Sequence, residues 1–311
     1  MKLLLVRHGE TVDNVAGLYA GISDSPLTNH GMVQARELGR FLCLTNNRIE
    51  RIYSSDLQRA YLTAEAISES QKIPPAPVVR LALIREKNFG RLERTKISKV
   101  GTSLLSNLSD LGSSRGPTAM SHDPESTMSM RIRAESFIDN YLAPSLHMVH
   151  EDATIAVISH GIFLSHLWRE LLKKFTRDKI NLSPTLRESM DTSLESITTW
   201  YNTAYLELCI TRLRDKEIQK SIQTSVIDKS MYATTFLQHP ELPLTSFRND
   251  LSQNECRNTR KNETFCYMKI TVISVNRRDH LDGVRKSRSG IGNLKYIPSQ
   301  RTMYSYLVKK D

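Results

Sequence analysis

The first ten residues place the strongest constraint on the fold of this chain. The run from Leu3 to Val6 is wholly apolar, which is typical of a strand buried on both faces in a parallel sheet. It stops abruptly at the polar sequence RHGE, residues 7–10. Ligands of open α/β sheets bind at the carboxyl ends of the strands. The sequence therefore predicts a buried first strand with a functional site directly after it.

Two further apolar runs end in residues of the same kind. The run TIAVIS leads into His160 and a helical pattern, and RIYSS leads into a helix with Arg59 in its first turn. If the three strands are parallel, these residues gather with Arg7 and His8 at one edge of a sheet. Strands that alternate with helices predict an α/β fold, namely a three-layer α/β/α sandwich with a mostly parallel central sheet.

The remaining pattern predicts one domain over residues 1–311. Its core is expected over 1–212, a polar insertion over 213–266, and a strand with a basic tail over 267–311. We expect VVRLALI (78–84) to be a strand, and Ser55 or Asp56 to cap the helix after RIYSS. We also expect helices near 28–42 and 128–149, strands within 196–213 and 267–276, a loop over 11–28, and a covering loop over 95–126.

The net charge of +10 is unevenly distributed. Residues 1–212 hold 25 Lys and Arg against 23 Asp and Glu, whereas residues 213–311 hold 18 against 10. A basic tail can bind an anionic partner such as nucleic acid or a membrane phosphoinositide. A solvated basic surface is the commoner outcome and is the interpretation favoured here.

No segment approaches the roughly 18 apolar residues of a membrane span. A cleaved signal peptide is not expected, because cleavage would remove Arg7 and His8. We therefore expect a protein of a reducing compartment, the cytoplasm or the nucleus. The cysteines have neither CxxC spacing nor a neighbouring histidine pattern, so free thiols are expected at Cys43, Cys209, Cys256 and Cys266.

The residue types at the three strand ends suit phosphoryl transfer. Guanidinium groups form bidentate hydrogen bonds to phosphate, and a neutral imidazole can attack phosphorus through one ring nitrogen. A carboxyl group can supply the proton that the leaving oxygen needs. Glu86, in the segment REKNFGRLE, is the candidate for that carboxyl group, and Glu93 in the same segment is the alternative. No metal-ligand spacing is present, so we expect no metal or other cofactor.

Several motifs together resemble the histidine phosphatase superfamily, also called the phosphoglycerate mutase-like family. The matching segments are LLLVRHGET, Asn14, SSDLQRAYLTA, REKNFGRLE and ISHG, in the family's order over residues 1 to about 210. Any one of them alone would be weak, whereas the full set is specific. The resemblance implies a metal-independent phosphatase with the family's α/β sandwich.

Carried over to this sequence, the resemblance implies a role for each matching residue. His8 would be the nucleophile and become phosphohistidine, and Glu86 would protonate the leaving oxygen and later activate water. The transferring phosphoryl group would be held by Arg7, Arg59 and His160. Asn14 would add a donor, and the positions expected to lie against the substrate are Gly9, Gly21 and Gly161.

Within the family, the sequence is more similar to phosphatases of the fructose-2,6-bisphosphatase-like branch and their fungal relatives. It departs from the family pattern at Arg94, where glycine is usual, and it lacks a glycine before Glu125. We therefore expect a small phosphorylated metabolite as substrate, such as a sugar bisphosphate. Two alternatives remain open, a phosphoglycerate-type mutase and a catalytically weak protein that binds an acidic partner through its tail.

Overall fold

The computed structural model describes residues 1–45, 47–71, 75–97, 123–189, 194–197, 199–213, 264–286 and 290–298. A seven-stranded sheet in the order β3-β2-β4-β1-β6-β7-β5 forms its centre. Among these strands β6 alone runs antiparallel to its neighbours, so the prediction of a mostly parallel sheet is confirmed. The strands are β1 (Lys2–Arg7), β2 (Arg48–Ser55), β3 (Val78–Leu81), β4 (Ala153–Ser159), β5 (Ile180–Leu182), β6 (Tyr205–Arg212) and β7 (Met268–Arg277).

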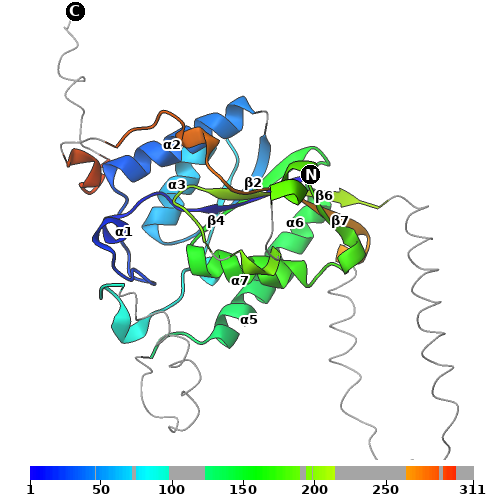
Figure 1. Cartoon of the computed structure of the whole chain (residues 1–311), viewed down its shortest axis with the longest axis horizontal. Helices are drawn as coiled ribbons and strands as arrows, with labels where there is room; N and C mark the ends of the chain where they lie inside the picture. Colours follow the sequence, from blue (N-terminus) through cyan, green and yellow to red (C-terminus); the bar gives the residue numbers. More distant parts are fainter. Residues whose placement is uncertain are drawn as a thin grey trace, which may run out of the picture.

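Helices cover both faces of this sheet, which gives the three layers that the sequence predicts (Figure 1). The helices α2 (Asn29–Leu44) and α3 (Gln58–Glu69) lie on one face. The other face carries α5 (Thr127–Phe137), the π-helical turn η3 (Ile138–Leu142), α6 (Ala143–Met148) and α7 (Gly161–Leu172). The shorter elements are α1 (Val12–Ala16), α8 (Pro184–Ser189), η1 (Ala82–Ile84), η2 (Gly90–Leu92), η4 (Arg177–Lys179), η5 (Leu194–Ser196), η6 (Asp279–Leu281) and η7 (Ile291–Asn293).

The unbroken apolar run in β1 reflects its central position. Leu4 and Val6 belong to the core under α2 and α3, whereas Leu3 and Leu5 belong to the core under α5 and α7. All four side chains are completely buried. Because successive side chains of a strand point to opposite faces, a strand covered on both sides needs apolar residues at every position.

The predicted strand VVRLALI is shorter than expected. β3 ends at Leu81, which pairs with Ser55, the last residue of β2. Beyond that point β2 offers no backbone groups to an edge strand, and residues 82–84 form one 3₁₀ turn instead. This turn buries Ile84 and directs the following segment toward the carboxyl edge of the sheet.

Two local predictions near the sheet edge are wrong. The expected loop contains helix α1, which a reciprocal capping box between Thr11 and Asn14 begins and Gly17, at φ 65°, ends. It buries no residue and so has no apolar face to detect. Helix α3 is not capped by Ser55 or Asp56, because its N-cap is Leu57. The Oδ1 atom of Asp24 accepts from the Gln58 N–H instead, at 2.8 Å.

Most of the expected covering loop (98–122) and of the polar insertion (214–263) lies outside the described residues. The chain returns to the sheet in β7, which pairs with β6. The following segment lies along α2, where Asn29 donates to the carbonyl of Leu294 and Tyr296 donates to that of Leu27. Cys43, Cys209 and Cys266 form no disulfide among the described residues, and Cys256 is not described.

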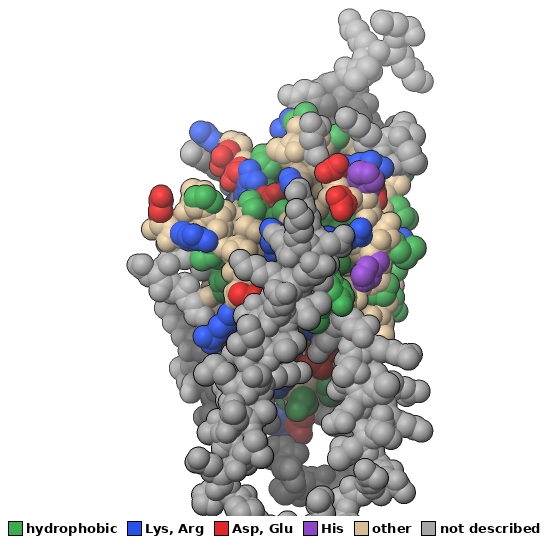
Figure 2. All heavy atoms as spheres, turned by 90° about the vertical axis from the view of Figure 1, so that its right-hand side faces the viewer, with side chains coloured by type: hydrophobic (Ala, Val, Ile, Leu, Met, Phe, Trp, Pro, Cys, Tyr) green, Lys and Arg blue, Asp and Glu red, His purple; other side chains and the backbone are tan. Residues whose placement is uncertain are grey.

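Charges of both signs are mixed on the face of the molecule that Figure 2 shows, among atoms that are not described. Two cations of the C-terminal segment are paired: Arg277 with Glu207 at 2.9 Å, and Lys286 with Glu10 at 2.8 Å. Such pairs leave less of the tail's positive charge for an anionic partner. Within the described ranges, no helix is both long and apolar enough to cross a bilayer.

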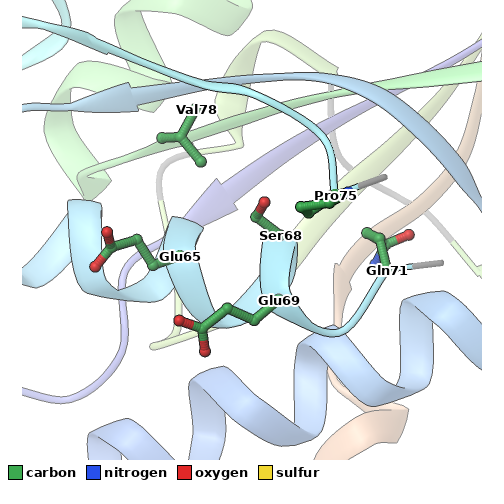
Figure 3. Close-up of a pocket in the computed structure, with 6 residues that line it drawn as sticks. All are labelled: Glu65, Ser68, Glu69, Gln71, Pro75 and Val78. Carbon is green, nitrogen blue, oxygen red and sulfur yellow. The ribbon is translucent and has the colours of Figure 1, made fainter. Parts of the chain in front are cut away.

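A pocket of about 320 Å³ lies at the end of α3, away from the functional edge (Figure 3). Nine residues of helix separate Ser68 from Arg59, which at 1.5 Å per residue is about 13 Å. One of its carboxylates, Glu65, already has partners in Tyr61 and Arg80. The pocket therefore has no part in the site described below; its lining residues are Glu65, Ser68, Glu69, Gln71, Pro75 and Val78.

The close contact between the end of β1 and α2 can be tested at Gly31. A methyl group there would lie 2.0 Å from the carbonyl oxygen of Glu10. We expect Gly31→Ala to lower the free energy of unfolding by about 2 kcal/mol, measured by urea denaturation, because backbone must move to admit the methyl group. At an exposed helix position the same change would stabilise by about 1 kcal/mol. An unchanged or higher stability would therefore contradict this packing.

Candidate active site

The carboxyl ends of β1 and β4 place two histidines side by side. Arg7 pairs with Ser159 in the parallel ladder, so the residues that follow, His8 and His160, leave the sheet together. Their ring centroids lie 5.0 Å apart. From the first turn of α3, the Nε atom of Arg59 reaches the Nδ1 atom of His160 at 3.2 Å. The structure thus brings together the four cationic or imidazole residues that the sequence places at strand ends.

Hydrogen bonds give the two imidazoles opposite tautomers. The Nδ1 atom of His8 lies 2.7 Å from the carbonyl oxygen of Gly9 and must donate to it, which leaves Nε2 with a free lone pair. The Nδ1 atom of His160 accepts from Arg59, so its Nε2 atom carries the proton. That N–H group is buried without a partner among the described residues. The pair therefore offers one nucleophilic nitrogen and one hydrogen-bond donor.

The two guanidinium groups are held by backbone carbonyls. Arg59 is 1% exposed and donates to the carbonyls of Gly21 at 2.6 Å and Ser23 at 2.8 Å. Arg7 donates to the carbonyl of Trp200, and its buried Nε atom has no partner in the described part of the chain. Buried polar groups are normally hydrogen-bonded. The free N–H of Arg7, like that of His160, is therefore suited to an anionic ligand.

Burial and positive charge act together on the protonation of this cluster. Burial, followed by the charge of Arg59, lowers the pKa of both His8 and His160 well below 6.5. Burial also lowers the pKa of Arg59 to about 10. At pH 7 the imidazoles are consequently neutral and both guanidiniums are charged. This combination attracts a phosphate anion and keeps the lone pair of His8 available.

Glu86 lies at the amino end of α7, beside the histidines. Its carboxylate accepts from the N–H groups of Phe163 at 3.1 Å, Lys87 at 2.9 Å and Ile162 at 3.3 Å. The positive end of a helix dipole favours an anion at this position. The negative charge of Glu86 also raises the pKa of Arg7 and of Arg59 against the effect of burial.

Glu93 has a different position from Glu86. Its carboxylate accepts from the N–H groups of Ile22 at 2.9 Å and Ser23 at 3.0 Å and from the Ser23 hydroxyl. This is the loop whose carbonyls hold Arg59. Both oxygens of Glu93 are thus committed to the loop, which argues against it as the proton donor. The next residue, Arg94, has φ 62°, a left-handed conformation that glycine adopts more readily than arginine.

The remaining predicted residues contact the site in different ways. The Oδ1 atom of Asn14 accepts from Thr11 and Asn202, which leaves its Nδ2 atom without a described partner. Gly9 is needed for packing, because a Cβ atom there would lie 2.5 Å from the carbonyl oxygen of Gly31. At Gly21 a Cβ atom would meet the Glu93 side chain, and φ is 55°. Gly161 has only ordinary contacts.

Sequence reasoning missed four residues that hold the site. Thr63 accepts from the Gly9 N–H at 3.0 Å, and Trp200 accepts from Arg7 through its carbonyl. Asn202 and Thr203 donate to the backbone of the turn at His8. The one sequence signal for Asn202 and Thr203 is that they are polar residues within the β-rich segment WYNT. In the ranges described, no group of three or more His, Cys, Asp or Glu side chains is arranged to hold a metal ion.

Fold and site together define an α/β protein with two buried histidines and two arginines clustered at the carboxyl edge of its sheet. The family model of the histidine phosphatase superfamily, branch 1, matches residues 3–191. The chain belongs to this superfamily, as the sequence motifs indicate.

Several known proteins are similar to the chain over part of its length. A probable phosphatase of Schizosaccharomyces pombe is 35% identical over 55% of this chain and 56% of its own length. Fructose-2,6-bisphosphatase TIGAR of Xenopus tropicalis is 35% identical over 44% and 48%. The chain thus spans about half the length of these relatives. A solved mycobacterial hydrolase, 20% identical with a TM-score of 0.51, covers 69% of this chain and 91% of its own, which supports the fold.

The lowered histidine pKa values predict that stability falls in acid. Burial lowers the pKa of His166 and of His280 to about 4, and the pKa of both site histidines is also lowered. Below about pH 6.5 the unfolded chain binds protons that the folded chain does not, so the free energy of unfolding decreases as the pH falls. Denaturant titrations between pH 7 and 5 measure this slope.

His166 offers a variant for that measurement, because it makes no hydrogen bond within the described residues. We expect His166→Gln to reduce the pH dependence by about 1 kcal/mol per pH unit below pH 6.5, with little change at pH 7.5. A wild-type stability that stays constant from pH 6.5 to 5 would contradict the assignment of neutral buried histidines.

The role of Glu93 can be separated from that of a general surface carboxylate. Glu93→Gln removes one acceptor oxygen and places an amide near the loop N–H groups, so we expect a loss of about 2 kcal/mol in unfolding free energy. Because the loop holds Arg59, binding of vanadate, measured by calorimetry, should weaken about tenfold. Glu37→Gln is the control, since Glu37 pairs with Arg40 on the surface of α2 and with no other cation among the described residues. Equal effects of the two variants would refute a loop-holding role.

Proposed function

We propose that the protein is a metal-independent phosphomonoesterase that acts through a phosphohistidine at His8. The observation that carries this proposal is the pair of opposite tautomers in one buried cluster. One imidazole offers a lone pair, while the other imidazole and two guanidiniums supply donors for phosphoryl oxygens. Covalent transfer to a nucleophile followed by hydrolysis needs this combination of groups.

In the first step, the Nε2 atom of His8 attacks phosphorus and the ester oxygen leaves. The Nδ1–H···O bond to Gly9 holds the ring in the reactive tautomer and stabilises the positive charge that develops on the imidazole. Arg7, Arg59 and His160 donate to the three equatorial oxygens, where charge accumulates in the transition state. Asn14 supplies a further donor through its Nδ2 group, which has no partner among the described residues.

We assign the proton transfers to Glu86. Phosphoryl oxygens compete with the Glu86 carboxylate for the N–H groups at the start of α7. A substrate that takes these donors leaves the carboxylate able to take up a proton from solvent, which it then gives to the leaving oxygen. In the second step the carboxylate accepts a proton from the water that attacks the phosphohistidine, which returns His8 and releases phosphate.

We propose a small phosphorylated metabolite, such as a sugar bisphosphate, as the substrate. The similarity to a fructose-2,6-bisphosphatase supports this class. Arg94, at the edge of the loop beside the site, departs from the family pattern. The identity of the sugar must therefore be determined by experiment. A panel of phosphorylated sugars, glycerates and nucleotides, compared by kcat/KM, identifies it.

The covalent intermediate provides the direct test. We expect wild-type protein incubated with ³²P-labelled substrate and quenched in alkali to carry acid-labile label on His8. His8→Ala should carry none, and its kcat should fall by at least about 10⁴-fold, because the nucleophile acts as a unit with its supporting residues. An exposed histidine, His150, is the control: His150→Ala should be labelled like the wild type.

Two outcomes would contradict the proposal. Label that persists in His8→Ala would place the nucleophile elsewhere. Absence of label and of phosphate release with every substrate of the panel would exclude a phosphatase. Separation of isomerised product from free phosphate distinguishes a mutase from a phosphatase.

A further inference from the structure

The turn that carries His8 is fixed from behind by residues that precede β6. The N–H of Thr203 donates to the carbonyls of Arg7 at 3.0 Å and His8 at 3.2 Å. The Nδ2 atom of Asn202 donates to the same His8 carbonyl at 3.1 Å. The Arg7 N–H in turn donates to the carbonyl of Ala204 at 3.1 Å. The backbone positions of Arg7 and His8 therefore depend on the conformation of the turn at Asn202 and Thr203.

That turn adopts an unfavourable conformation. Thr203 has φ 56° and is completely buried. The left-handed region is unfavourable for a residue other than glycine, and a β-branched side chain is especially unsuited to it. Such a conformation persists only where the surroundings determine it. An additional contact must hold Thr203 in place.

His280 provides that contact. Its Nε2 atom lies 2.9 Å from the Thr203 hydroxyl oxygen, and this hydroxyl itself donates to the Asn202 carbonyl at 2.8 Å. The hydroxyl must therefore accept from His280, whose Nε2 atom carries the proton. The imidazole is 5% exposed and packs near the rings of Phe41 and Tyr205. Its orientation is thus fixed independently of Thr203.

The segment that carries His280, residues 277–286, is attached to the core at both ends. We name it the C-terminal brace. At one end Arg277 pairs with Glu207 of β6 at 2.9 Å. At the other end Lys286 donates to both carboxylate oxygens of Glu10 at 2.8 Å. Since Glu10 follows His8 by two residues, the brace is linked to the nucleophile's turn directly at Glu10 and, through His280, indirectly at Thr203.

We propose that the C-terminal brace positions the nucleophile, and that His280 is a positioning residue acting through Thr203. The proposal rests on the function proposed above. It predicts that loss of the His280 donor misplaces His8 and the backbone of Arg7, while Arg59 and His160, which the brace does not hold, still bind phosphate. The rate of phosphoryl transfer should fall much more than substrate affinity.

Two substitutions of His280 differ only in how far their amide reaches. The side-chain nitrogen of glutamine can take the place of Nε2, whereas that of asparagine reaches only as far as Nδ1. We expect His280→Asn to lower kcat, and the single-turnover rate of phosphohistidine formation, at least about tenfold with KM changed less than about threefold. We expect His280→Gln to restore both rates to within about threefold of the wild type. Thermal unfolding of the full chain verifies that each variant is folded.

The other end of the brace gives a test that does not disturb the buried imidazole. Lys286→Met keeps the aliphatic stem and removes the ion pair to Glu10, and we expect it to lower kcat about threefold. Arg285→Met is the matched control, because Arg285 is exposed and makes no ion pair within the described residues. It should leave kcat unchanged. If His280→Asn does not fold, the comparison of Lys286→Met with Arg285→Met still tests whether the brace positions the nucleophile.

Three results would overturn the inference. They are a wild-type kcat in His280→Asn, an equal loss in the asparagine and glutamine variants, and equal rates for Lys286→Met and Arg285→Met. The intermediate separates this failure from that of the proposed function. If wild-type protein forms phosphohistidine and His280→Asn forms it equally fast, only the brace is wrong. If the wild type forms none, the proposed function itself fails.

Discussion

The site depends above all on one buried hydrogen bond, from the Nε atom of Arg59 to the Nδ1 atom of His160. It joins the first turn of α3 to the end of β4 and determines which nitrogen of His160 carries the proton. Two further N–H groups of Arg59 donate to the carbonyls of Gly21 and Ser23 and so hold the loop over the sheet edge. The guanidinium of Arg59 thereby links the start of α3, the end of β4 and the loop at Gly21 and Ser23. It can do so because its donors diverge in one plane.

Burial of two cations beside two neutral imidazoles is costly unless an anion compensates them. Part of the compensation comes from carbonyl oxygens and part from Glu86 at the start of α7. The Nε–H of Arg7 and the Nε2–H of His160 have no partner among the described residues and so remain available to a ligand. The same burial that makes the cluster costly to fold strengthens its attraction for an anion, since each charge interacts more strongly where water is excluded.

Much of the fold could be predicted because its signals are local. The unbroken apolar runs of β1 and β4, and the helical spacing in α2, reflect burial that each element shows in its own sequence. Errors arose where a distant partner replaced a local one. Helix α3 is capped by Asp24 rather than by its own Asp56, and β3 stops where β2 ends. Helix α1 buries nothing, so no periodicity revealed it.

The sequence by itself determined which residues would stand at the strand ends, because parallel strands must bring the residues that follow them to one edge. Only the tertiary structure decided the tautomers of His8 and His160, the contrast between Glu86 and Glu93, and the contact of His280 with the strained Thr203. These features depend on hydrogen bonds between residues far apart in the chain. Periodicity and spacing describe only neighbours along the sequence, so such long-range contacts leave no pattern in it.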